Sequence, residues 1–331
     1  MTASDTAPPG SPEPPLAPRV PHFEVRLTAP RLDDWMSGNC GVPGFQHFET
    51  GRAGPHVLIT ALMHGNEIAG AIVLDELLRT RVRPLRGKLT LGFLNLAAFA
   101  RFDTAQPTAS RFVDEDMNRL WDSAILEGSR DSTELARARE IRPIIDSADI
   151  LLDLHSMLWP SEPLILSGPT AKGRRLACAI GTPRMAVADR GHSSGPRLID
   201  YDGFADEADP RIACLVESGP HWEPATVATA RTATEALLRL TGLVAYAGIP
   251  ASADVRSRCA EVTEVVTAMT SGFSFVRSFR GGDVIPERHT LIATDSGREI
   301  RTPHDHCLLV MPSLRPSRGH TAVRLARFLL E

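Results

Sequence analysis

The chain has 331 residues, of which 43% are hydrophobic and 23% are charged, and this balance excludes a chain that is disordered along its whole length. A length of this order predicts two domains, or one large domain with an appendage. Thirty-six basic and 40 acidic side chains give a net charge of −4, which argues against an electrostatic binder of nucleic acid or of a membrane surface. No apolar run approaches the ~20 residues that a membrane helix needs.

The first 22 residues predict a disordered, Pro-rich tail, because seven prolines fall within the first 21 positions. This segment has neither the basic start nor the apolar run of a signal peptide. The five cysteines are widely spaced and never form CxxC, which indicates reduced thiols and a cytoplasmic protein. A homo-oligomer is compatible with these features.

From residue 23 onward, apolar runs alternate with helical patterns. Buried strands are predicted at 56–62, 88–94, 150–154, 184–188 and 212–217, and helices at 68–78, 132–146 and 224–240. This alternation predicts an α/β domain over residues 23–248, with a mostly parallel sheet flanked by helices. Short β-rich runs separated by GGD, DSG and TPHD turns then predict a small all-β domain over residues 249–331.

His64 and Glu67 follow the first of these strands in the motif HGNE. Residues three apart on a starting helical turn share one face, so both side chains can reach one ion. Imidazole and carboxylate together suit Zn²⁺, and a catalytic zinc site needs a third protein ligand. The pair by itself also fits an ordinary solvated helix face.

His155 strengthens the metal interpretation because it ends a second apolar strand, ILLDLH. The carboxyl ends of strands are where α/β sheets place their ligand sites. A hydrogen-bonded structural histidine is the alternative for His155 alone, but the two strand ends together favour a His₂Glu zinc site. Asp153 is expected to alternate away from the site, as an outer group or a turn cap.

Glu217 ends a third apolar strand, IACLVE. A carboxylate there could take a proton from the attacking water and return it to a leaving amine, or form an ordinary salt bridge. Arg111 lies between these motifs and offers forked donors for a carboxylate or an oxyanion. Asn118 and Arg119 follow it, and all three could equally be surface residues.

Four motifs, in this order, resemble the succinylglutamate desuccinylase/aspartoacylase family of the zinc carboxypeptidase superfamily: HGNE (64–67), RFVDEDMNR (111–119), DLHS (153–156) and VESGP (216–220). The segments FRGGDVIP, IATDSGREI and MPSLRPSRGHTAVRLA resemble the C-terminal module of the same family. The resemblance implies a zinc-carboxypeptidase-like mixed sheet flanked by helices, followed by a small all-β domain.

The resemblance also implies roles for individual side chains. One zinc ion per chain would be held by His64, Glu67 and His155, and Glu217 would be the general acid/base. Arg111 would polarise the scissile carbonyl, while Asn118 and Arg119 would hold the substrate carboxylate. The expected activity is deacylation of a small N-acylated amino acid, with neither nucleic acid nor membrane as a partner.

The chain departs from the family where aspartoacylase-like proteins carry a further arginine shortly before the catalytic glutamate. Glu207 lies near that place and Arg211 lies closer to Glu217, which puts recognition of a second carboxylate in doubt. His221 and Trp222 directly follow the VESGP motif that contains Glu217, and they either line the pocket or have a structural role.

Other residues carry weaker signals. His304 and His306 form an HxH pair, which fits a polar turn better than a metal site. The acidic run 114–116 is expected to be solvated or to cap a helix. Two alternative functions stay open: a metallocarboxypeptidase that uses the same residues on peptides, and a non-catalytic protein that binds small molecules on the same fold.

Overall fold

The computed structural model describes residues 23–192, 194–245 and 257–329. The expected Pro-rich tail over 1–22 and the expected domain boundary at 248 both lie outside these residues, so the division into domains stays a prediction. None of the helices in the described ranges is long and apolar enough to cross a membrane.

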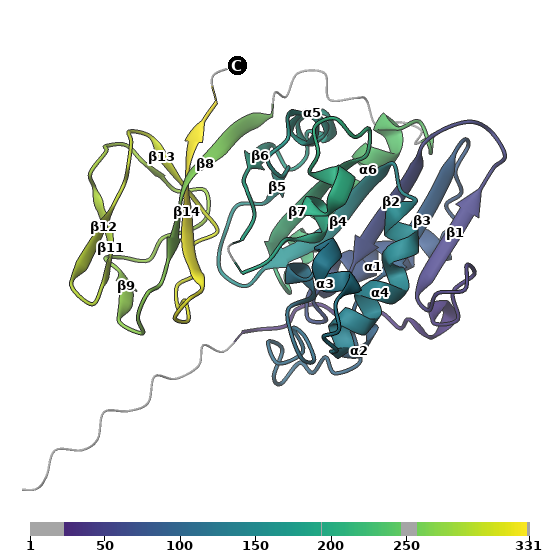
Figure 1. Ribbon diagram of the computed structural model, residues 1–331, viewed down its shortest axis with the longest axis horizontal. Coiled ribbons are helices and arrows are strands. Elements are labelled where there is room, and N and C mark those ends of the chain that lie inside the picture. The colour runs from purple at the N-terminus through teal and green to yellow at the C-terminus, as the bar shows by residue number, and fades with distance from the viewer. Residues whose placement is uncertain (1–22, 193, 246–256, 330–331) are drawn as a thin grey trace, which may run out of the picture.

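One large mixed sheet runs through the molecule, from the N-terminal strands to the C-terminal ones (Figure 1). Its strands, in spatial order, are β1 (Phe45–Glu49), β3 (Lys88–Phe93), β2 (His56–Ala61), β4 (Ile150–Met157), β7 (Ile212–Pro220), β5 (Leu164–Leu166), β6 (Met185–Ala188), β8 (Arg258–Thr267), β14 (Thr321–Phe328), β13 (Cys307–Val310) and β10 (Val284–Ile285). The centre of the sheet is parallel, because β3, β2, β4 and β7 all run in one direction. The predicted α/β layer is therefore confirmed, with antiparallel strands β1 and β5 added to it.

Helices cover both faces of the central strands. They are α1 (Ile68–Arg79), α2 (Leu96–Phe99), α3 (Ser123–Glu127), α4 (Thr133–Asp146), α5 (Ala171–Ile180) and α6 (Pro224–Leu240). Helices α1, α5 and α6 pack on one face and α4 on the other. Alternate residues of β2 point into the apolar clusters on the two faces of the sheet. Val57 and Ile59 belong to the cluster with α1, α5 and α6, whereas Leu58 packs with α4.

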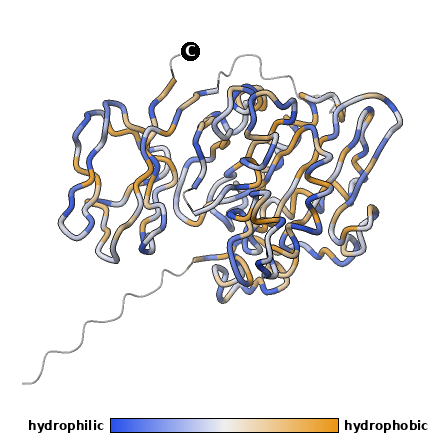
Figure 2. Tube along the Cα trace, viewed as in Figure 1, coloured by the Kyte–Doolittle hydropathy of each residue, from blue (hydrophilic) through white to orange (hydrophobic). Residues whose placement is uncertain are grey.

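The C-terminal part contains only strands among its described residues 257–329. A second sheet, made of β9 (Phe273–Phe275), β11 (Leu291–Asp295) and β12 (Arg298–Arg301), packs against β13 and β14 around a third apolar cluster. The C-terminal strands are joined to the rest by the parallel pairing of β6 with β8. Figure 2 shows that hydrophobic residues concentrate along the strands of the main sheet.

Candidate metal centre and active site

Three adjacent parallel strands bring the predicted site together. Strands β2, β4 and β7 are neighbours, so their carboxyl ends meet at one edge of the sheet. His64 lies three residues beyond β2, and His155 on β4 stands directly opposite Glu217 on β7 in the ladder. His155 and Glu217 therefore lie inside strands that run two to three residues further than their apolar runs indicate.

Gly65 explains why the HGNE loop can pack so closely. A Cβ atom at Gly65 would lie 2.3 Å from the carbonyl carbon of Ala98 and 2.6 Å from the carbonyl oxygen of Ser110. Its N–H donates to the carbonyl oxygen of Arg111 at 3.1 Å. The glycine thus lets the loop that carries His64 and Glu67 lie against the segment that carries Arg111.

The three predicted ligands form one buried cluster. Glu67 Oε1 lies 2.7 Å from His64 Nδ1, and Glu67 Oε2 lies 3.1 Å from His155 Nδ1. One ligand atom from each residue can be chosen so that all lie within 4.8 Å of one another. Both imidazoles therefore present Nδ1 to the same carboxylate, which is an arrangement able to hold a metal ion.

A second carboxylate lies behind each of the two imidazoles. His64 Nε2 is 2.9 Å from Asp116 Oδ1, and His155 Nε2 is 2.7 Å from Asp153 Oδ2. Carboxylates in such positions fix the tautomer and the orientation of metal-binding histidines. Asp153 is thus the outer group that the sequence allowed, but it does not alternate away from His155, because residues two apart on a strand share a face. Thr60 Oγ1 also donates to Asp153 at 2.7 Å.

The charges of this cluster support one another. Burial opposes ionisation of Glu67, but the two imidazoles outweigh it and hold the pKa of that carboxyl well below its usual value. Burial likewise opposes protonation of His155, yet Asp153 and Glu67 raise its pKa well above normal. The cluster is thus a compact set of mutually stabilised acids and bases.

Glu217 differs from the other carboxylates of the site because its Oε2 is buried and has no hydrogen-bond partner within the described chain. Burial, assisted by the like charge of Glu67, raises the pKa of Glu217 to about 8, although His155 and Arg111 oppose the shift. A carboxyl group of this kind is suited to exchanging a proton near neutral pH.

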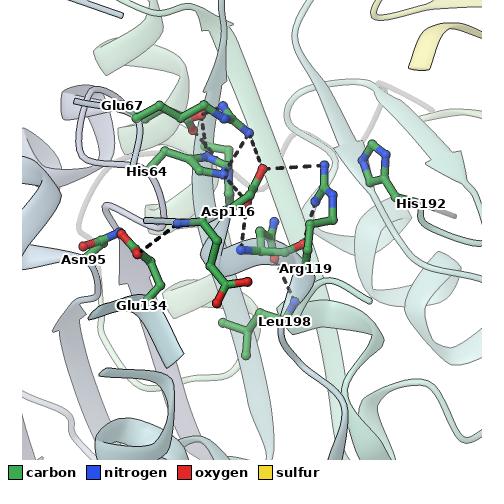
Figure 3. A network of polar contacts seen from close by, with 12 residues as sticks. His64, Glu67, Asn95, Asp116, Arg119, Glu134, His192 and Leu198 are labelled. Carbon is green, nitrogen blue, oxygen red and sulfur yellow. Dashed lines mark hydrogen bonds and ion pairs between the residues drawn. The ribbon is translucent and has the colours of Figure 1, made fainter. Parts of the chain in front are cut away.

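Arg111, Asn118 and Arg119 line the same cavity as the cluster, and each of them contacts Asp116. Figure 3 shows Asp116 between His64 and Arg119. Arg111 donates to Asp116 Oδ2 at 3.0 Å and to Glu67 Oε1 at 3.3 Å. The backbone N–H of Asn118 donates to Asp116 Oδ1, so Asp116 does cap a short helical turn as expected, besides contacting His64.

The side chain of Asn118 is partly committed already, since its Oδ1 accepts a hydrogen bond from the N–H of Leu198 at 2.8 Å. Burial, together with neighbouring guanidinium groups, lowers the pKa of Arg119 to about 10 despite the opposing charge of Asp116. Arg119 therefore lies in a desolvated, positively charged environment that an anion would relieve.

His221 lines the cavity, whereas Trp222 lies outside its lining and holds a neighbouring loop in place. His221 Nδ1 is 2.8 Å from Ser156 Oγ, and burial lowers the pKa of His221 to about 4, so the ring is neutral at physiological pH. Trp222 Nε1 donates to the carbonyl oxygen of Asn66 at 3.0 Å, which fixes the HGNE loop. The aromatic residue that lines the cavity is instead Trp159.

All eight predicted site residues line one cavity of about 210 Å³. Sequence reasoning missed the part of its wall that comes from distant segments: His192, Arg197, Met311, Pro312, Ser313, Thr321 and Arg324. The one sequence signal for Arg324 is a charged residue inside the apolar run AVRLA.

The remaining candidates lie elsewhere. His304 contacts Thr263 Oγ1 at 2.9 Å in the C-terminal part, and the HxH pair lies in a turn, as expected. Glu207 accepts hydrogen bonds from the first N–H groups of α5. Arg211 pairs with Asp202 and Asp209 and is absent from the lining of the cavity.

Comparison with solved structures shows the same overall fold. The succinylglutamate desuccinylase from Vibrio cholerae has a TM-score of 0.65 at 17% identity, covering 87% of this chain and 86% of that one. The Ectoine utilization protein EutE (DoeB) from Ruegeria pomeroyi, solved with product bound, has a TM-score of 0.60 at 17% identity, covering 85% and 88%.

Sequence comparison matches part of the chain to one family. A curated succinylglutamate desuccinylase from Pseudoalteromonas atlantica is 31% identical over 117 residues, a segment that spans 32% of this chain and only 32% of that protein. The model of the Succinylglutamate desuccinylase/Aspartoacylase catalytic domain matches residues 53–185, which include His64, Glu67, Arg111 and His155. The resemblance seen in the motifs is thus confirmed: residues 53–185 of this chain are similar to the catalytic domain of the succinylglutamate desuccinylase/aspartoacylase family.

Proposed function

We propose that this protein is a zinc-dependent hydrolase that cleaves the amide bond of a small N-acylated amino acid or a related carboxylate. One observation carries the proposal: Glu217, a buried carboxyl with an unpartnered oxygen in the described chain, shares a cavity with the His64–Glu67–His155 cluster. A metal-ligand set beside a free acid/base group is the arrangement that metal-assisted hydrolysis requires.

The residues present fit one zinc ion per chain. Two imidazoles and one carboxylate are the protein ligands of a catalytic zinc site that keeps an open position. The Nε2 atoms of His64 and His155 are already held by carboxylates, which leaves the Nδ1 atoms beside Glu67 for the metal. When bound, zinc supplies Lewis-acid activation of a water molecule and of a carbonyl oxygen.

The protein's own groups would carry the proton and orient the substrate. Glu217 would accept a proton from the attacking water and return it to the leaving nitrogen, because its free Oε2 faces no competing donor in the described chain. Arg111, which already reaches the edge of the cluster through Glu67, would donate to the acyl oxygen. Arg119 and the amide NH₂ of Asn118 would hold the substrate carboxylate.

The size and fold of the site support small substrates. A cavity of about 210 Å³ falls below the range of ordinary drug-sized pockets, which favours an acyl amino acid over a peptide. Residues 311–313 of the C-terminal part line it together with the catalytic cluster. We further propose that the central sheet with its helices is of the zinc carboxypeptidase type.

A hydrolysis assay tests the proposal. The zinc-loaded protein is expected to hydrolyse N-acyl amino acids faster than oligopeptides and to lose activity on chelation. Glu217→Gln should keep its zinc and lose turnover by about 10²–10⁴-fold, because the proton carrier is gone. Glu162→Gln, the same change at an exposed position, is the matched control and should leave turnover unchanged. Near-normal turnover of Glu217→Gln would sink the proposed mechanism, and no amide hydrolysis by the zinc-loaded protein would sink the function.

A further inference from the structure

Part of the cavity lining is apolar, and the proposed mechanism gives it no task. Five of its residues are large apolar side chains from different strands and loops: Met157, Trp159, Leu166, Leu215 and Met311. Leu166 and Leu215 are direct partners in the ladder between β5 and β7, and Met311 packs against the apolar cluster that contains both leucines. Met157 lies two residues beyond His155 on the same strand, so apolar lining begins beside the metal cluster. We call these five residues the apolar wall.

Trp159 is half-buried and is braced by an aromatic residue from the start of the described chain. The ring of Phe23 contacts that of Trp159 edge to face, with centroids 5.7 Å apart, and it contacts Trp222 in the same way at 5.8 Å. The loop after Trp159 is tied to the C-terminal part, because the N–H of Gly281 donates to the carbonyl oxygen of Pro160 at 3.1 Å. The indole that lines the cavity is therefore held in place rather than free to turn into solvent.

Met311 reaches the cavity through an unusual backbone conformation. Its φ is 50°, in the left-handed region that favours glycine and costs free energy for other residues. Methionine cannot offset this cost by the local hydrogen bonds that Asn or Asp would form. Strain of this kind persists at ligand sites, where the position of the side chain is required. The flexible thioether side chain is also well suited to filling irregular apolar space around a ligand.

The charged side chains of the cavity balance one another. Four arginines line it, and five carboxylates line it or pair with these arginines: Arg111, Arg119, Arg197 and Arg324 against Glu67, Asp116, Asp189, Asp200 and Glu217. Arg324, which comes from β14, lies 3.3 Å from Asp189 Oδ2 and donates to His192 Nε2 at 2.7 Å. Each of these arginines thus faces a carboxylate of the chain, and Arg119 with Asn118 is assigned to one substrate carboxylate. The rest of the substrate is therefore expected to be uncharged.

We propose that the apolar wall binds a hydrocarbon group of the substrate, so that the protein is specific for N-acyl amino acids with one carboxylate and an apolar side chain or acyl chain. This inference rests on the proposed function and deepens it by naming the substrate class. Each methylene group that enters the apolar wall leaves water, which raises affinity by about fourfold. Since the cavity measures about 210 Å³, a short hydrocarbon group is expected rather than a long fatty chain. Trp159 and Met311 are the specificity-determining residues.

A binding measurement tests this without hydrolysis. The zinc-loaded protein is titrated calorimetrically with acetate, butyrate and hexanoate, and with adipate, the dicarboxylate that has the chain length of hexanoate. Affinity should rise by about threefold or more per methylene group from acetate to hexanoate, and adipate should bind at least tenfold more weakly than hexanoate. Trp159→Ala and Met311→Gly should each flatten this rise. Leu240→Ala, which removes an apolar side chain that is 48% exposed and outside the cavity lining, should keep it.

A substrate panel shows which half of the substrate carries the hydrocarbon group. N-acetylglycine, N-acetylleucine and N-acetylglutamate test the amino-acid half, and N-acetylalanine, N-pentanoylalanine and N-succinylalanine test the acyl half. Wild type is expected to prefer the apolar member of one set over both other members by about tenfold or more in kcat/KM. Trp159→Ala should lower this ratio to less than about threefold, whereas Trp159→Phe, which keeps an aromatic ring, should retain most of it.

Each other outcome has a distinct meaning. Affinity that does not rise with chain length, or adipate that binds as tightly as hexanoate, would overturn the role of the apolar wall. An equal loss on apolar and small substrates in Trp159→Ala would show a merely structural role and overturn it as well. Absence of all hydrolysis would overturn the proposed function, and the titration still decides whether the apolar wall binds hydrocarbon. Should Trp159→Ala fail to fold, Met311→Gly decides, because glycine adopts a φ of 50° without strain, and an undiminished rise in that variant contradicts the proposal.

Discussion

At the residue scale, the two histidines of the metal cluster are defined by what stands behind them. Each uses Nδ1 toward Glu67 and has its Nε2 against a further carboxylate, Asp116 for His64 and Asp153 for His155. Both ring nitrogens of each imidazole are thereby engaged, which positions both rings before any metal binds. The side chains that hold the ligands should consequently control metal affinity.

Replacing either outer carboxylate should weaken metal binding. Asp116→Asn and Asp153→Asn keep the shape of the side chain but remove its charge, so each is expected to lower zinc affinity by about 10–100-fold. The measurement is competition with a chelator of known affinity. Glu115→Gln is the control, because Glu115 pairs with Arg130 and lies outside the cluster. Unchanged zinc affinity in both aspartate variants would contradict the role assigned to these carboxylates.

The ligands could be predicted from sequence because each follows or ends an apolar strand, and adjacent parallel strands place such residues at one edge. Arg324 could not be found in this way. Its strand is buried at Ala322–Ala326, so alternation does not reveal which side chain reaches the cavity. The contact depends on the packing of β14 beside a segment that lies more than a hundred residues earlier, His192.

At the element scale, the sequence predicts the central strands and helices closely but not how the edges of the sheet are paired. The helix predicted at 224–240 and the one at 132–146 match α6 and α4 within one residue, because their apolar periods are strong. Strand β5 pairs antiparallel with β7, and no local sequence pattern predicts this pairing. Strand pairing of this kind is decided by non-local contacts.

One helix terminus organises the loop that carries Arg111. Glu134, in the first turn of α4 and fully buried, accepts hydrogen bonds from the N–H groups of Val113, Asp114 and Glu115 at 2.6–3.2 Å. It also accepts one from Asn95 Nδ2 at 3.0 Å, and Figure 3 shows it beside Asn95. The carboxylate of Glu134 thus ties residues 113–115 to the helix, and Asp114 Oδ2 adds a further link by accepting a hydrogen bond from the N–H of Thr133 at 2.7 Å.

Glu134→Ala should destabilise the protein strongly, because four donors lose their acceptor together. We expect a decrease of about 3 kcal/mol or more in the free energy of unfolding, measured by urea denaturation. Glu140→Ala lies on the same helix and removes a carboxylate that pairs with Arg137 near the surface. That control should cost no more than about 1 kcal/mol. Equal costs for the two variants would show that Glu134 does not anchor the loop.

At the scale of the whole molecule, the C-terminal strands extend the catalytic sheet. The β6–β8 pairing joins the two parts, and Leu308 and Ala326 of β13 and β14 belong to the same apolar cluster as α4. Leu309, the neighbour of Leu308, faces the other way into the cluster between the two C-terminal sheets. A sheet and a core shared in this manner favour one cooperative unit, even though the sequence predicts two domains.

This continuity has a measurable consequence for unfolding. The four tryptophans lie at positions 35, 121, 159 and 222, so their fluorescence reports only the part of the chain before β8, whereas circular dichroism reports all of it. Wild type should show coincident urea transitions with both probes. Leu308→Ala and Leu309→Ala each empty a buried leucine site, and each should cost about 2–5 kcal/mol.

The pair of leucine variants discriminates between one unit and two. In one cooperative unit, Leu309→Ala shifts the tryptophan transition as much as Leu308→Ala does, because unfolding either cluster unfolds the other. In two independent units, Leu309→Ala shifts only part of the dichroism signal and leaves the tryptophan midpoint in place. The second result would contradict the shared core and would separate the strand that carries Arg324 from the stability of the metal cluster.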